Sequence, residues 1–81
     1  MMDFTRHIVY PEGDTQEIFH ALQINQLVDI NGRPATLPLS THRVILYRVQ
    51  KIVNREERKE TSSFYYLEQL PLEELLTLVS R

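Results

Sequence analysis

A chain of 81 residues with a net charge of −2 and no cysteine can build only one hydrophobic core, so we expect a single domain over residues 1–81. The absence of cysteine excludes disulfide bonds and thiolate metal ligands, and leaves apolar packing and sheet hydrogen bonds as the sources of stability. The slightly acidic balance gives no general attraction for nucleic acid or acidic membranes, so such binding would need a local basic patch.

The N-terminal part of the chain predicts a short strand and no targeting segment. Residues alternate between two faces from Phe4 to Tyr10, and Pro11 and Gly13 then favour a turn. No apolar run in the sequence is long enough for a signal peptide or a membrane span. We therefore expect a cytoplasmic protein without membrane association.

The segment after this turn supports two alternatives. Asp14 followed by Glu17 resembles a helix-capping box. Ile18 and Leu22 would then lie one turn apart on a short helix, which we assign to Thr15–Ala21. Alternating apolar residues in the same segment fit a strand instead.

The dipeptide Asn31-Gly32 predicts a tight hairpin turn. If these two residues form the whole loop, Ile30 and Arg33 are a hydrogen-bonded pair. Asp29 and Pro34 are then the next pair, which has no hydrogen bonds between its members. The missing N–H of Pro34 would face away from this partner.

The residues after the turn are therefore expected to form an edge strand over Arg33–Leu39, or to leave the sheet. Pro34 and Pro38 cannot donate backbone hydrogen bonds, which confines such a segment to a sheet edge.

Two β-rich runs predict one long hairpin. They are Arg43–Val53 and Thr61–Leu70, and they flank the charged segment Asn54–Glu60. A turn centred in that segment would place Arg55 opposite Glu60.

The polar pair Gln50-Lys51 interrupts the first of these runs, which is apolar on both sides of the interruption. This indicates either that the strand emerges into solvent or that a β-bulge changes which face is buried.

The C-terminal segment predicts a helix. Pro71 suits the first helical position, and Glu73 and Glu74 complement the positive end of the helix dipole. Leu78 lies off the centre of the predicted apolar stripe. The stripe consists of Leu72, Leu75, Leu76 and Val79.

These elements predict an α+β fold that is mostly β. The first strand and the two antiparallel hairpins give five strands in a strongly bent sheet or a small SH3-like barrel, with a short N-terminal helix and a C-terminal helix. An open α+β sheet is the alternative, because alternation alone does not establish that a barrel closes.

The sequence offers no catalytic or metal-binding constellation. His7, His20 and His42 have no metal-ligand spacing, and the two glycines do not form a phosphate loop. The serine and threonine before His42 point to opposite faces of an extended chain and do not form a nucleophile–base pair. We therefore expect a protein that is not an enzyme, with no catalytic residues, metal or cofactor.

One candidate surface is a basic and aromatic strand face, because bases stack on aromatic rings while cations hold phosphate. Tyr65 must point away from Phe64 and Tyr66, so part of this aromatic cluster belongs to the core. The residues predicted for a nucleic-acid face are Arg43, Tyr47, Arg48, Lys51 and Tyr66.

The other candidate surface is a protein interface. The predicted edge strand Arg33–Leu39 can accept a strand from another chain, and an apolar terminal helix can pack against a second copy in a homodimer. The residues predicted for this interface are Arg33, Leu37, Leu39 and Leu78. Our leading hypothesis is a non-enzymatic binding or adaptor module for a protein partner, and the alternative is a small nucleic-acid-binding barrel.

Overall fold

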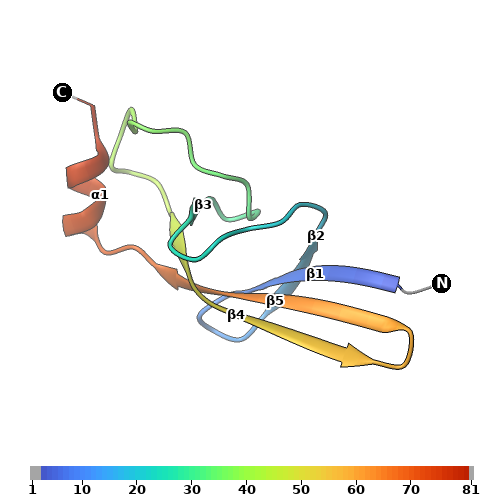
Figure 1. Cartoon of the computed structure of the whole chain (residues 1–81). Helices are drawn as coiled ribbons and strands as arrows, with labels where there is room; N and C mark the ends of the chain where they lie inside the picture. Colours follow the sequence, from blue (N-terminus) through green and yellow to red (C-terminus); the bar gives the residue numbers. More distant parts are fainter. Residues whose placement is uncertain (1–2, 81) are drawn as a thin grey trace.

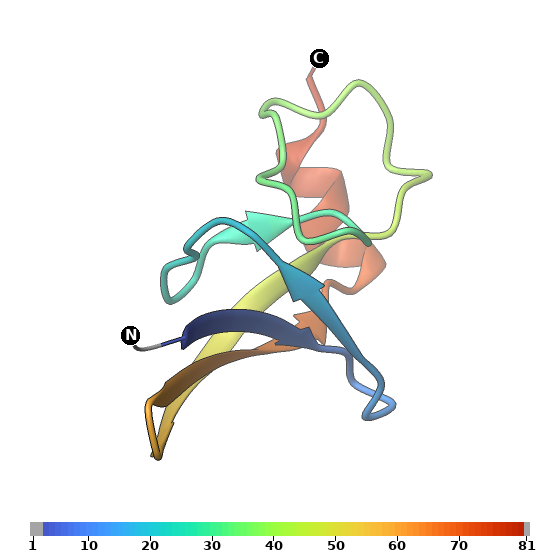
Figure 2. The same cartoon turned by 90° about the vertical axis from the view of Figure 1, so that its right-hand side faces the viewer.

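The computed structural model describes residues 3–80, while Met1, Met2 and Arg81 lie outside the described residues. Five strands form a mixed sheet in the order β2-β1-β5-β4-β3, which curls into a half-barrel (Figures 1 and 2). The elements are β1 (Asp3–Val9), β2 (Thr15–Ile18), β3 (Leu27–Val28), β4 (Tyr47–Glu57), β5 (Glu60–Gln69) and α1 (Leu72–Leu78). The predicted mostly-β fold with a bent five-stranded sheet and a C-terminal helix is confirmed.

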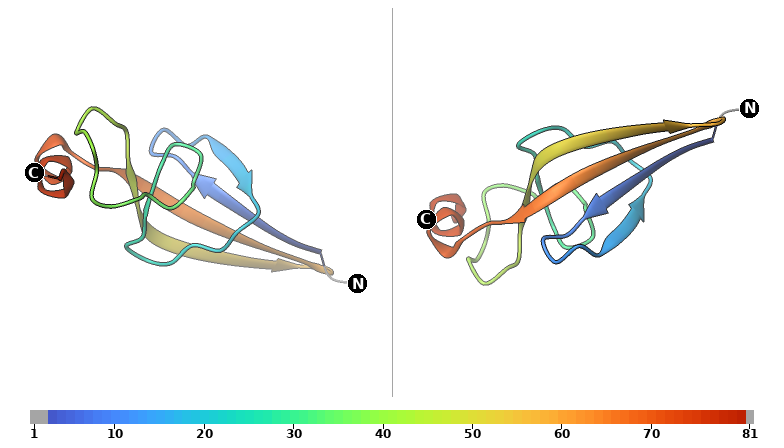
Figure 3. Two further views of the ribbon diagram at one scale, coloured as in Figure 1. Left: turned by 90° about the horizontal axis from the view of Figure 1, so that it is seen from above. Right: turned by 90° about the horizontal axis from the view of Figure 1, so that it is seen from below.

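The molecule is elongated, with principal extents of 50 × 21 × 17 Å. The tip of the β4–β5 hairpin lies at one end and α1 at the other (Figure 3). Among residues 3–80, no helix combines the length and the hydropathy that crossing a bilayer requires.

The segment assigned to an N-terminal helix is a strand, so that prediction was wrong. Thr15–Ile18 forms β2 and pairs with β1 in an antiparallel ladder. The ladder places Ile18 in the core, where it is 5% exposed. A helix of about two turns has little stability of its own, so pairing with β1 and burial of Ile18 outweigh the capping box.

The turn after β3 differs by one residue from its predicted register. The Asp29 N–H donates to the Arg33 carbonyl oxygen at 2.9 Å, and the Gly32 N–H donates to the Asp29 carbonyl oxygen at 3.0 Å. The Asp29 Oδ1 also accepts the N–H groups of Asn31 and Arg33. The loop therefore has three residues and ends at Gly32, whose φ of +78° completes a type I turn followed by a left-handed residue.

The segment after this turn leaves the sheet, as its prolines predicted. Pro34 lies opposite Val28 rather than Asp29, in an isolated bridge. The Ala35 N–H donates to the Leu27 carbonyl oxygen at 2.9 Å. Further along, Leu39 forms a parallel bridge with Val79 after α1.

The predicted long hairpin is present as β4 and β5, but its turn is tighter than expected. The two-residue turn Arg58-Lys59 brings Glu57 opposite Glu60, and Arg55 lies opposite Ser62. The predicted pairing of Arg55 with Glu60 was therefore wrong. Lys59 adopts a φ of +57°, which lets the charged segment continue as strand almost to its tip.

A β-bulge interrupts β4 at Gln50, and this confirms one of the two interpretations of the polar pair Gln50-Lys51. The register with β5 shifts between Val49 and Lys51, so Gln50 is the extra residue. Val49 faces the core and is fully buried, whereas Lys51 lies opposite Tyr66. The bulge therefore changes which face the following residues occupy.

The hydrophobic core is divided into two clusters. The first lies inside the half-barrel and consists of Ile8, Ile18, Leu22, Val28, Tyr47, Val49, Tyr65 and Leu67. The second joins α1 to the segment before β4 and consists of Leu39, Leu46, Leu70 and Leu75, with Leu27, Ala35, Leu78 and Val79 packed against it.

The predicted helix is confirmed, with Pro71 as its N-cap rather than its first helical residue. Its apolar stripe is rotated from the prediction: Leu75 and Leu78 face the second cluster, whereas Leu72 and Leu76 are more than half exposed. The Leu39 N–H donates to the Leu78 carbonyl oxygen at 2.8 Å. This bond ties the C-terminal end of α1 to Leu39, a member of the second cluster.

Candidate binding groove

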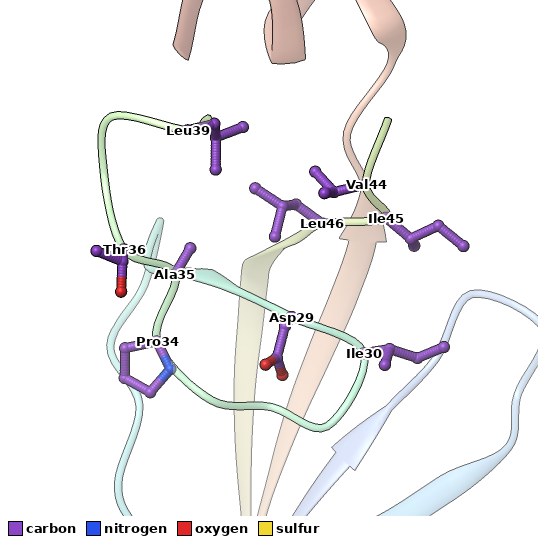
Figure 4. Close-up of a pocket in the computed structure, with 9 residues that line it drawn as sticks. All are labelled: Asp29, Ile30, Pro34, Ala35, Thr36, Leu39, Val44, Ile45 and Leu46. Carbon is purple, nitrogen blue, oxygen red and sulfur yellow. The ribbon is translucent and has the colours of Figure 1, made fainter. Parts of the chain in front are cut away.

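A groove with a volume of about 510 Å³ lies between the segment after β3 and the residues that lead into β4 (Figure 4). It is lined by Asp29, Ile30, Pro34, Ala35, Thr36, Leu39, Val44, Ile45 and Leu46. Asp29 and Thr36 are the two polar lining residues, and the other seven are apolar. The groove therefore offers aliphatic contact rather than acid–base chemistry.

The floor and the rim of the groove differ in exposure. Leu39 and Leu46 form the floor and belong to the second core cluster, and they point toward each other from different segments (Figure 4). The rim residues Ile30 and Ile45 are 51% and 49% exposed, and Val44 is 36% exposed. Covering aliphatic side chains that are this exposed with a ligand lowers the free energy, because apolar surface leaves water.

The turn at residues 29–33 holds Ile30 in place because it packs against side chains of β1 and β2. Gly32 is buried there: a Cβ on this residue would lie 3.2 Å from side-chain atoms of both Ile8 and Ile18. His20 donates from Nε2 to the Gly32 carbonyl oxygen at 2.7 Å, and the Tyr10 hydroxyl donates to the Ile30 carbonyl oxygen. The rim at Ile30 is therefore anchored to β2 and to the end of β1.

Asp29 contributes to the groove wall mainly through the turn. Its Oδ1 accepts two backbone N–H groups, at 2.8 and 3.0 Å. This carboxylate is thus already used to fix the loop that carries Ile30.

A second cavity, with a volume of about 360 Å³, adjoins the groove because Ile30 lines both. Its lining is polar and aromatic, and consists of Tyr10, Glu12, Asp14, Gln16, Ile30, Asn31 and Tyr47. The rings of Tyr10 and Tyr47 meet edge to face, with centroids 5.7 Å apart. An aliphatic cavity and an acidic, aromatic cavity therefore meet at Ile30.

Residues 4–78 match the profile of a family described as an uncharacterised Treponema protein. The chain belongs to this family. No curated protein and no solved structure matches it. Function in this Treponema family therefore has to be inferred from the surfaces of the fold.

The residues predicted for a protein interface fall in different environments in this family member. Leu39 lines the groove floor, and Leu78 packs against the same second cluster. Leu37 is 48% exposed two residues before Leu39, and Arg33 is exposed at the end of the turn. Of these four residues, the structure places only Leu39 in the groove.

Three residues predicted for a nucleic-acid face share the outer face of the sheet, opposite the half-barrel core. They are Arg48, Lys51 and Tyr66, and the Lys51 Nζ lies 4.7 Å from the centroid of the Tyr66 ring. Tyr47 instead belongs to the first core cluster, and Arg43 is exposed in the segment before β4. The structure therefore divides this predicted site.

Arg48 is held by two carboxylates. Its Nη1 lies 3.0 Å from Glu68 Oε1, and both of its terminal nitrogens donate to Glu74 on α1. Hydrogen bonds from Arg48 lower the pKa of the Glu74 carboxyl, and the bonds to Glu74 and Glu68 raise the pKa of Arg48. The guanidinium thus joins α1 to the sheet and is already neutralised by its partners.

The outer face of the sheet carries more negative than positive charge. Its aromatic centre is Phe64, which stacks on His7 with centroids 5.1 Å apart and lies under Arg55. The strand register and alternation assign to this face the cations Arg48, Lys51 and Arg55 and the carboxylates Asp3, Glu17, Glu57, Glu60 and Glu68. Such a balance disfavours the phosphate backbone of a nucleic acid.

The three histidines occupy separate environments. His7 stacks on the outer face, His20 supports Gly32, and His42 is exposed before β4. Across residues 3–80, no group of three His, Asp or Glu side chains is arranged to hold a metal ion.

The groove residues missed by sequence reasoning include the three exposed residues of its rim, Ile30, Val44 and Ile45. Each had a local signal. Ile30 is an isoleucine in a hairpin loop, where polar residues and glycine are favoured. Val44, Ile45 and Leu46 are consecutive apolar residues, which cannot all point to one side of an extended segment.

Proposed function

We propose that this protein is a non-enzymatic binding module that holds a segment of a protein partner in the aliphatic groove. The observation that carries this proposal is the exposed rim of Ile30, Val44 and Ile45 over a floor formed by Leu39 and Leu46. A partner that covers this rim removes apolar surface from water, and each Å² of apolar surface buried contributes about 25 cal/mol of favourable free energy. Hydrogen bonds tie the Ile30 carbonyl to Tyr10 and the Leu46 carbonyl to Leu70, so both sides of the groove are attached to the fold.

The chemistry of the groove favours a protein segment over a nucleic acid. Its nine lining residues include no aromatic ring on which a base could stack, and no lysine or arginine that could hold a phosphate. Branched aliphatic side chains instead match apolar side chains of a partner, which act as anchors in peptide-binding grooves.

Selection from a random peptide library displayed on phage tests this proposal without a known partner. The selection is run on the full chain and on the rim variant Ile45→Ser, with Leu76→Ser as the matched control. Leu76 is 53% exposed on α1 and does not line the groove, so both substitutions remove a similar exposed apolar side chain.

We expect enriched peptides with apolar anchors that bind the wild type and Leu76→Ser equally. The same peptides should bind the Ile45→Ser variant roughly tenfold more weakly, because this substitution removes one apolar contact for an anchor side chain. Absence of enrichment, or equal binding of the peptides to all three proteins, would overturn the proposal.

A second candidate function is single-stranded nucleic-acid binding on the outer face of the sheet. The observation in its favour is that Phe64 and Tyr66 alternate along β5 beside the cations Arg55 and Lys51. An amide NMR titration with short single-stranded DNA and RNA, at low and moderate salt, separates the two functions. Salt-sensitive shifts on this face would favour nucleic acid; because of the excess of carboxylates, we expect none.

A further inference from the structure

We infer that the partner segment carries a lysine or arginine side chain that occupies the second cavity while its apolar side chains occupy the groove. This inference rests on the proposed function, and it names the chemistry of the partner. The continuity of the two cavities at Ile30 makes it possible for one short segment to fill both.

The chain geometry supports this continuity at two places. Ile30 is shared, with its side chain lining both hollows. Leu46 on the groove floor and Tyr47 in the second cavity are also neighbours in the chain, Leu46 just before β4 and Tyr47 as its first residue. A segment that leaves the groove past Ile30 therefore reaches the side chain that also lines the second cavity.

The lining of the second cavity has the charge that a cation requires. Glu12 and Asp14 are exposed carboxylates on the β1–β2 turn, and no lysine or arginine lines the cavity. The remaining lining includes two tyrosine rings, and aromatic faces attract cations through the ring quadrupole. A carboxylate on the ligand would instead meet like charges.

The state of Tyr10 is consistent with this environment. Its hydroxyl is already committed to the Ile30 carbonyl oxygen, with Gln16 Oε1 2.8 Å away as a second acceptor. Burial raises the pKa of Tyr10, and the nearby Tyr47, Glu12 and Asp29 contribute to the same shift. Tyr10 therefore remains a neutral phenol, and its hydroxyl proton is already shared between protein acceptors.

The same phage selection tests the inference when its enriched peptides are analysed for charge. We expect lysine and arginine at a fixed spacing from the apolar anchor, at least about twofold above their frequency in the library. The double variant Glu12→Lys/Asp14→Lys should lose this enrichment and favour acidic residues instead. The matched control, Glu56→Lys/Glu57→Lys, makes the same change in net charge at the exposed tip of the β4–β5 hairpin and should retain it.

A binding measurement with the best peptide then isolates the contact. Replacing its basic residue by alanine should weaken binding to the wild type about threefold to fivefold, the range of an exposed ion pair. In Glu12→Gln/Asp14→Asn the same replacement should have a clearly smaller effect, because only the attraction to the tyrosine rings remains. These neutral substitutions lie on exposed side chains, so the variant is expected to keep the fold, which an amide NMR spectrum verifies.

The outcomes distinguish failure of the proposed binding groove from failure of the inference about a basic residue. Peptides that depend on Ile45 but show no basic residue would overturn the inference and leave the binding groove in place. Peptides that do not depend on Ile45 would overturn both. Basic enrichment that survives Glu12→Lys/Asp14→Lys would also overturn the inference, because the cation would then lie elsewhere.

Discussion

Replacement of Gly32 by alanine should destabilise the protein because this glycine lets the turn pack into the half-barrel. Gly32 has a φ of +78°, and an added Cβ would lie 3.2 Å from the Ile18 Cγ2 and the Ile8 Cδ1. Both isoleucines are buried, at 5% and 0% exposure. Neither can move away without disturbing the first core cluster.

Two effects contribute to the expected loss of stability. An alanine in the left-handed region costs about 1–2 kcal/mol. Overpacking the core by a methyl group costs about 1–3 kcal/mol more. The sum, about 2–5 kcal/mol, is a large share of the roughly 5–15 kcal/mol that stabilises a folded domain.

Gly13→Ala is the matched control. Gly13 also has a positive φ, of +100°, but an added Cβ would meet no atom within 4 Å. The Gly13→Ala variant should therefore lose only the stability that the left-handed backbone conformation costs an alanine, about 1–2 kcal/mol.

Urea unfolding followed by far-ultraviolet circular dichroism measures both variants, with the free energies of unfolding compared at equal m-values. We expect Gly32→Ala to be less stable than Gly13→Ala by at least about 1 kcal/mol. Equal destabilisation of the two variants would refute the reasoning, since it would show that the turn does not pack tightly against Ile8 and Ile18.

Two further predictions concern the helix contact and the core. Arg48 lowers the pKa of Glu74 below its ordinary value of 4.5, so the stability from this carboxylate is present at neutral pH and is lost as the pH falls through the lowered pKa. Glu74→Gln should thus unfold at lower urea than the wild type at pH 7, and the difference should shrink below about pH 4; a constant difference would contradict this. Leu67→Ala should cost about 2–5 kcal/mol because Leu67 is 2% exposed, whereas Phe19→Ala, at an 84% exposed site, should stay within about 0.5 kcal/mol; equal losses in urea unfolding would count against the assigned core.

Local sequence signals predicted the β4–β5 hairpin and α1. The alternation before and after the charged segment indicated the β4–β5 hairpin, and the polar pair at Gln50-Lys51 indicated its bulge. Pro71 and the glutamates that follow indicated α1. In each case the pattern that specifies the element lies within the element itself.

The errors arose where a distant contact or a side chain decided the outcome. β2 depends on pairing with β1, and β1 in turn lies parallel to β5, more than fifty residues away in the chain. The turn register depends on the Asp29 carboxylate, which accepts backbone N–H groups and favours a three-residue loop over the expected two-residue loop. Alternation in the first segment was compatible with a strand, but it did not show the partner strand, and turn propensity did not show the hydrogen bonds of the Asp29 carboxylate.

The groove itself could not be predicted because two separate segments form it. Ile30 comes from the turn after β3, and Val44 and Ile45 come from the segment before β4. The sequence marks these residues only as apolar in unusual places. Their juxtaposition follows from the second core cluster, in which Leu39 and Leu46 meet.

Amide chemical-shift mapping with the tightest selected peptide is the most direct test of the groove as the binding surface. The account predicts saturable shifts at Ile30, Ala35, Val44 and Ile45, on both sides of the groove, with little change on the outer face of the sheet. Shifts concentrated around Phe64 on that outer face, with the groove residues unchanged, would contradict it.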